Sequence, residues 1–210
     1  MKRKFKSAIA ICLLFACIGS LLVSCGKSAT VKISEMTTEE LEECVGLCEY
    51  KNIEVSVNGV SKYDALLSHI MVNSCVKKYP VGTVSYYVEQ LKKQYRYYAN
   101  EADMRYEDML NELGEDNITM KKDARELVKK DLIFELIRRR ENITLTDTEK
   151  SKFFDRYVKK YAEDYKYSEE YVREELFELV YDSMLHDKTM EFLILNNRFV
   201  EKTSDMTDKT

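Results

Sequence analysis

The chain has 210 residues, with 33 Lys or Arg, 37 Asp or Glu and a formal net charge of −4. This length suits one or two small domains, and the acidic balance disfavours nucleic acid or an anionic membrane surface as a partner. The 2 His and 6 Cys form no cluster with metal-ligand spacing, so we expect no metal and no other cofactor.

The N-terminus has the pattern of a secretory signal peptide. Basic residues at Lys2, Arg3, Lys4 and Lys6 precede an apolar stretch over 8–23. That stretch is short and rich in small residues, which is typical of a signal peptide rather than a spanning helix. The alternative is an uncleaved anchor helix, and both interpretations place the rest of the chain outside the cytoplasm.

The end of this segment, Leu22-Val23-Ser24-Cys25-Gly26, resembles the bacterial lipobox. The resemblance implies cleavage between Ser24 and Cys25 and lipidation of the Cys25 thiol, so that acyl chains hold the mature protein at the outer face of the cell membrane. Removal of residues 1–24 lowers the basic residues from 33 to 29 against 37 acidic ones, a formal charge of −8.

Three further cysteines, Cys44, Cys48 and Cys75, belong to the expected mature chain. An odd number implies no complete disulfide framework. Cys44 and Cys48 are close enough in sequence to pair in an oxidising compartment, although Gly46 between them argues against one shared helix. The sequence leaves this disulfide open.

Residues 25–44 are expected to form a polar tether and a short helix that begins at the capping pattern Thr37-x-x-Glu40. Beyond it, Ile53, Val55 and Val57 alternate with polar residues, which predicts one short strand with a single apolar face. The dipeptide Asn58-Gly59 then predicts a turn.

Helical spacing of apolar residues continues along the chain. We predict a helix over 61–78, ended by Tyr79-Pro80, and a longer one over 83–111. Within its last part, 106–113 is expected to be a separate short helix that Gly114 closes in a left-handed conformation.

The stretch 119–201 reads as three helices separated by turns. The second helix begins at the capping pattern Thr146-x-x-Glu149, and the third begins at Ser168. The run 138–140 consists of Arg, which we interpret as cations favoured at a helix C-terminus. The polar tail 203–210 is expected to be disordered.

Several segments together resemble trigger factor. The run Glu49-Tyr50-Lys51-Asn52-Ile53-Glu54-Val55 looks like its first linking strand, and the segment from Arg105 is similar to its C-terminal domain. The matching pieces there are Tyr106-Glu107-Asp108-Met109-Leu110, Ala124-Arg125-x-x-Val128-Lys129-x-Asp131-Leu132, Ile143-Thr144-Leu145-Thr146-Asp147-x-Glu149, Phe192-Leu193 and Phe199-Val200-Glu201. The resemblance covers 45–202 and implies a mainly α, elongated, SurA-like chaperone domain with two arms around a cradle.

Two parts of trigger factor are expected to be missing. No ribosome-docking signature occurs, and only residues 58–60 separate Val57 from Ser61, where an isomerase domain of the FKBP type would need many more. The chain also has no Gly-rich phosphate loop, no Ser nucleophile elbow and no Cys with a nearby His. We therefore expect no enzyme activity, and an isomerase label would be inherited from relatives.

The resemblance implies a lipid-anchored chaperone that binds unfolded or nascent secreted proteins without ATP. Its expected client-facing residues are aromatic or Met side chains, which adapt to irregular apolar partners: Tyr87, Tyr95, Tyr97, Tyr98, Met104 and Met109. A stripe at helical spacing is equally consistent with core packing. The alternatives are an assembly lipoprotein for one specific partner and residual isomerase activity. Whether two copies pair into a dimer stays open.

Overall fold

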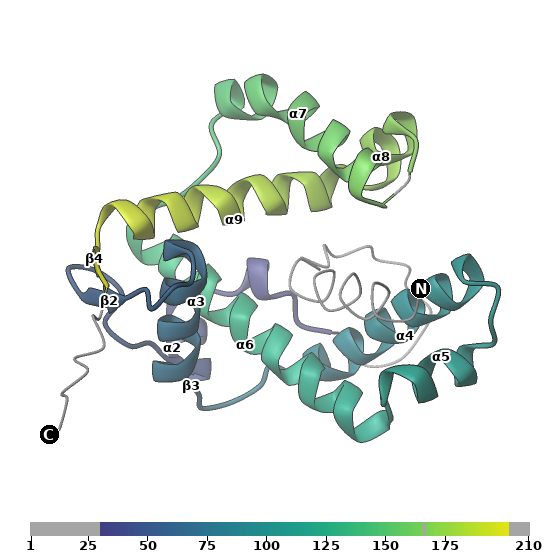
Figure 1. The fold of residues 1–210 in the computed structure, drawn as a ribbon. Coiled ribbons are helices and arrows are strands. Elements are labelled where there is room, and N and C mark those ends of the chain that lie inside the picture. The colour runs from purple at the N-terminus through teal and green to yellow at the C-terminus, as the bar shows by residue number, and fades with distance from the viewer. Residues whose placement is uncertain (1–29, 166, 202–210) are drawn as a thin grey trace, which may run out of the picture.

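The computed structural model describes residues 30–165 and 167–201, and it confirms the expected mainly α fold (Figure 1). In chain order the elements are the 3-10 helix η1 (Ile33–Glu35), α2 (Thr38–Cys44), β1 (Val45–Gly46), β2 (Glu54–Ser56), α3 (Lys62–Asn73), β3 (Cys75–Val76), α4 (Thr83–Glu101), α5 (Tyr106–Leu113), α6 (Asn117–Glu141), α7 (Asp147–Tyr165), α8 (Glu169–Glu175), α9 (Phe177–Leu195) and β4 (Arg198–Val200).

The predicted helix starts are confirmed by their caps. The Thr37 hydroxyl accepts from the Glu40 amide while the Glu40 carboxylate accepts from the Thr37 amide, which is a complete capping box. Thr146 and Glu149 make the same reciprocal pair before α7, and Ser168 caps α8. At the end of α5, Gly114 has a φ of 72°, as the left-handed cap requires.

Two predicted helices are shorter than expected. The helix predicted over 61–78 ends at Asn73, because Cys75 and Val76 pair with Gly46 and Val45 as an antiparallel ladder between β3 and β1. The helix predicted over 83–111 ends at Glu101, and Asp103 with a φ of 49° separates it from α5. Likewise, Leu176 divides the third predicted helix into α8 and α9.

The prediction of a single strand was wrong in number. Within the described residues, four short strands form two pairs. The strand expected around Ile53 and Val57 is β2, and it pairs in parallel with β4, where Val55 is opposite Phe199. The Val57 amide extends this ladder by donating to the Val200 carbonyl at 3.0 Å. The pairing joins the start of the helical domain to its end.

The apolar clusters of the described residues divide the helices into a body and two arms. The body core lies between α2, α3, α4, α6 and the last part of α9, and includes Leu41, Leu66, Ile70, Leu91, Leu132, Phe134, Ile137 and Leu193. A second core, made by α7, α8 and the first half of α9, contains Val158, Val172, Leu176, Val180 and Met184. We call this unit the second arm, and Figure 1 shows α7 and α8 standing away from the body beside α9.

The first arm consists of α4 and α5, which project from the body near the N-terminal end of α6 (Figure 1). Ala99 and Met109 are both buried where the two helices meet. At the opposite end of α6, the Tyr50 hydroxyl and the Lys51 ammonium donate to Glu141 at 2.6 and 2.8 Å. Burial raises the pKa of Glu141, but these hydrogen bonds outweigh it and lower the pKa overall. The segment before β2 is thereby fixed to α6.

Candidate binding cavity

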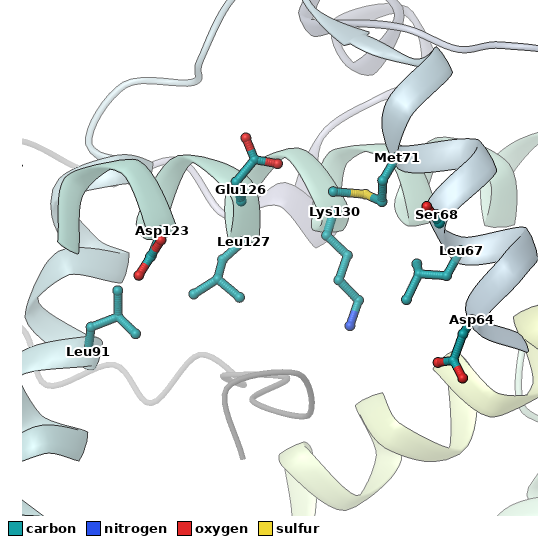
Figure 2. Close-up of a pocket in the computed structure, with 9 residues that line it drawn as sticks. All are labelled: Asp64, Leu67, Ser68, Met71, Leu91, Asp123, Glu126, Leu127 and Lys130. Carbon is teal, nitrogen blue, oxygen red and sulfur yellow. The ribbon is translucent and has the colours of Figure 1, made fainter. Parts of the chain in front are cut away.

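A cavity of about 500 Å³ lies between α3, α4 and α6 (Figure 2). Two helices supply its long walls with the same spacing of residues i, i+3, i+4 and i+7, which places four side chains on one helix face. These residues are Asp64, Leu67, Ser68 and Met71 on α3, and Asp123, Glu126, Leu127 and Lys130 on α6. Leu91 of α4 completes the lining. Figure 2 shows Asp123, Leu127 and Lys130 pointing from α6 to the side where Leu91, Leu67 and Asp64 lie, whereas Glu126 points the other way.

The floor of the cavity is apolar. Leu91 is fully buried, whereas Leu67, Met71 and Leu127 are half-buried and keep part of their carbon surface accessible. Such surface gains free energy when an apolar group covers it, at about 25 cal/mol per Å². Met71 also has an unbranched, polarisable side chain that fits partners of different shape.

The rim of the cavity is mostly acidic. Asp64, Asp123 and Glu126 bring three carboxylates, against the one ammonium group of Lys130. Burial raises the pKa of Asp123, Lys122 opposes this shift and Glu126 adds to it. An apolar floor with this rim suits an apolar side chain that has a basic neighbour.

A buried polar contact joins α9 to α3, and the charge of one residue that lines the cavity, Lys130, acts on it. His186 on α9 is 4% exposed, its Nε2 is 2.6 Å from the Tyr63 hydroxyl, and its ring centroid is 4.6 Å from that of Phe134. Burial, with help from the charges of Lys130 and Arg138, lowers the pKa of His186 to about 3. The imidazole is therefore neutral in the folded protein at neutral pH, and it joins α9 to α3 and α6.

The six residues predicted to face a client fall into two groups, and none of them lines the cavity. Tyr87, Tyr95 and Met109 are buried, Tyr95 completely, and Tyr87 donates a hydrogen bond to Asp131. For these three the core interpretation is correct, because their side chains hold α4 to α6 and α5. Tyr97, Tyr98 and Met104 are half-buried near the end of α4, where a client-binding role stays a prediction.

Other predicted sites are not placed by the structure or show no partner. Ser24 and Cys25 lie outside the described residues, while Cys44, Cys48 and Cys75 are free thiols. In the described ranges 30–165 and 167–201, no group of His, Cys, Asp or Glu is arranged to hold a metal ion. No helix in the same part of the chain is long and apolar enough to cross a membrane.

The comparisons with known proteins agree on one family. The sequence pattern of the bacterial trigger factor protein (TF) C-terminus matches residues 62–195, which include the whole cavity. A trigger factor from Caldicellulosiruptor saccharolyticus is 24% identical over 205 residues, covering 84% of this chain and 46% of that protein. The chain thus spans about half the length of the curated relative it matches. No solved structure matches it.

Proposed function

Because the chain belongs to the family of the bacterial trigger factor C-terminus, we propose that it is a chaperone that holds unfolded polypeptides without ATP. Family membership points to a chaperone-type function. The observation that carries the finer proposal is the cavity inside the matched range, with its half-exposed apolar floor. The proposed clients are unfolded or nascent secreted proteins.

The cavity would hold a client by its apolar side chains. Leu67, Met71 and Leu127 offer accessible carbon surface on two different helices, so a client side chain placed between them loses contact with water on both sides. The carboxylates at the rim would favour a client segment with Lys or Arg nearby and disfavour an acidic one. Neither binding nor release would need ATP. Binding is driven by the burial of apolar surface, and the client leaves when it folds and buries the same side chains in its own core.

We propose that binding occurs without prolyl isomerisation. The segment between β2 and α3 comprises only residues 57–61, so the position at which the resemblance would place an isomerase domain is a tight turn. Asn58 and Gly59 both have positive φ, at 41° and 80°, which this turn requires. A prolyl-peptide assay should therefore give the uncatalysed rate.

The test of the holdase proposal uses the soluble 26–210 fragment and a reduced, unfolded model protein that aggregates. We expect suppression of light scattering at a few-fold molar excess of fragment over the model protein. No suppression at that excess would contradict the proposal. If the fragment instead captures one folded partner in equimolar amount, the alternative of an assembly lipoprotein is favoured.

We also propose that the protein is anchored by lipid at the outer face of the cell membrane, on the basis of the Leu22–Gly26 pattern. Replacement of the acceptor thiol by Cys25→Ser is expected to abolish incorporation of labelled palmitate and to leave the precursor uncleaved. Cys75→Ser, which changes another thiol, should be labelled like the wild type. Continued labelling of the Cys25→Ser variant would rule out this anchor.

A further inference from the structure

Four Tyr rings form a continuous chain between the tips of the two arms. Tyr97 on α4 is 5.8 Å from Tyr98 and 5.9 Å from Tyr167, measured between ring centroids. Tyr167 lies in the turn between α7 and α8 and is in turn 5.1 Å from Tyr171. The contact between Tyr97 and Tyr167 therefore joins residues of the first arm to residues of the second.

The second arm is otherwise built around its own core. That core and the half-buried side chains packed on it come from residues 145–184, and none belongs to α4 or α5. The second arm is connected to the body through α9 and through the turn after α6. A small change at these connections would separate the tips while leaving both cores intact.

The contact between the Tyr97 and Tyr167 rings is too weak, and too exposed to water, to hold the two arms together permanently. Tyr97 and Tyr167 are only half-buried, and Tyr171 is 45% exposed. A tilted aromatic pair favours the joined state over the separated one by only a few-fold to about tenfold. Both states are then populated, and a ligand that prefers the separated state can shift the balance.

The cavity and the ring contact share a helix. Leu91, which lines the cavity, and Tyr97 lie on α4 six positions apart, about 9 Å along its axis. Six positions also turn the helix by about 240°, so a polypeptide that occupies the cavity has to pass around α4 as well as along it to reach the position where Tyr97 meets Tyr167. The two events, client binding and contact between the tips, then compete for the same part of α4.

We propose that the Tyr97–Tyr167 contact is a latch that joins the arm tips in the client-free protein and opens when an unfolded client occupies the cradle. This inference rests on the proposed chaperone function for the identity of the ligand. It assigns Tyr97 a role different from direct client contact, and the two roles predict opposite effects of removing the ring.

The first experiment tests the latch in the free protein. The chain has no Trp, so Tyr97→Trp in the 26–210 fragment introduces a single Trp, which is excited selectively at wavelengths that Tyr does not absorb. We expect its emission to shift to longer wavelength when Tyr167→Ala is added, because the indole loses its covering ring. An unchanged emission maximum would overturn the latch, whether or not the protein is a chaperone.

The second experiment measures affinity for reduced, carboxamidomethylated ribonuclease A, a permanently unfolded probe without Trp whose blocked cysteines carry no added charge. Tyr97→Ala and Tyr167→Ala should each tighten binding about two- to tenfold. Either change removes the ring contact that favours the joined state, so a larger fraction of the protein is already open when the client binds. Weaker binding would overturn the proposal and make the rings client contacts. Phe177→Ala is the matched control: Phe177 is an exposed ring of the second arm that contacts Tyr181, and its removal should leave the affinity within twofold.

These outcomes separate the two proposals. If the wild-type fragment does not bind the unfolded probe, the chaperone function fails, and the emission of the free Tyr97→Trp variant still decides whether the tips are joined. If Phe177→Ala also tightens binding, the effect comes from loss of aromatic surface in general, and the latch is rejected.

Discussion

A decrease in pH from 6.5 to 4 is expected to destabilise this protein by about 3 kcal/mol through His186 alone, because each pH unit changes the free energy of unfolding by about 1.4 kcal/mol when one proton is taken up only on unfolding. The folded protein holds this imidazole neutral, with a pKa of about 3 compared with 6.5 for an exposed His. The stability it contributes is complete above pH 6.5 and is lost as the pH falls towards 3. His186→Gln, which keeps an acceptor for Tyr63, should remove most of this pH dependence.

Burial determines the sign and most of the size of the effect, and the neighbouring charges modify it. Lys130 and Arg138 of α6 both oppose a proton on His186. Asp182, one turn earlier on α9, acts in the opposite direction, since burial raises its pKa to about 6 and its protonation relieves repulsion from Asp131 as the pH falls. Its side chain is nevertheless more than a third exposed and is screened by water, so the nearly fully buried His186 dominates.

The measurement is urea unfolding of the 26–210 fragment at pH 7, 5.5 and 4.5, for the wild type and for His186→Gln. The difference between the two curves isolates His186 from the carboxylates, which titrate in both proteins. His69→Gln is the matched control, because His69 is the second His and lies at the surface of α3 near Asn73. Parallel curves for the wild type and His186→Gln would show that His186 does not titrate as described.

The double substitution Met71→Gln and Leu127→Gln is expected to weaken binding of an unfolded client at least about tenfold, which corresponds to about 1.4 kcal/mol. Each change replaces accessible carbon on one wall of the cavity by an amide that an apolar client side chain would have to desolvate. Both side chains are half-buried, so the helical fold should be kept. Binding of reduced, carboxamidomethylated ribonuclease A measures the effect.

The control for this substitution lies next to Met71. Val72 is on the same helix and is 75% exposed, but it does not line the cavity. Val72→Gln removes an exposed apolar side chain of α3 without touching the cavity, so it should bind the client like the wild type. Equal weakening by Val72→Gln would mean that general surface hydrophobicity, rather than this cavity, holds the client.

Local signals in the sequence predicted where helices begin. Thr37 and Thr146 each precede a Glu by three positions, and Ser168 directly precedes Glu169 and Glu170. Each cap forms within one turn of chain, without help from the rest of the fold. The ends of α3 and α4 were harder to predict. Cys75 leaves the helical pattern only because Gly46, far away in sequence, offers a ladder partner. The pairing of β2 with β4 could not be predicted for the same reason, because the two strands are far apart in sequence.

The residues that line the cavity form a pattern in the sequence, but the sequence alone does not show that this pattern marks a cavity. The lining face of residues 64–71 carries two polar and two apolar side chains, and that of 123–130 carries three charged side chains and one apolar one. Such mixed faces are usually solvated surface, and only the packing of α3 beside α6 turns them into two walls. Conversely, the sequence left the Tyr stripe of α4 equally consistent with client contact and with core packing, and Tyr87 and Tyr95 are buried in the core.

The parallel pairing of β2 with β4 has a consequence for how such chains diversify. It brings the exposed Asn58–Val60 loop close to the point where the polypeptide leaves the helical unit after Val200. Residues inserted into such an exposed loop extend over the surface and break no contact between helices. The scaffold is thus modular at this position, and a whole folded unit could be gained or lost there while the cavity-bearing helices stay as they are.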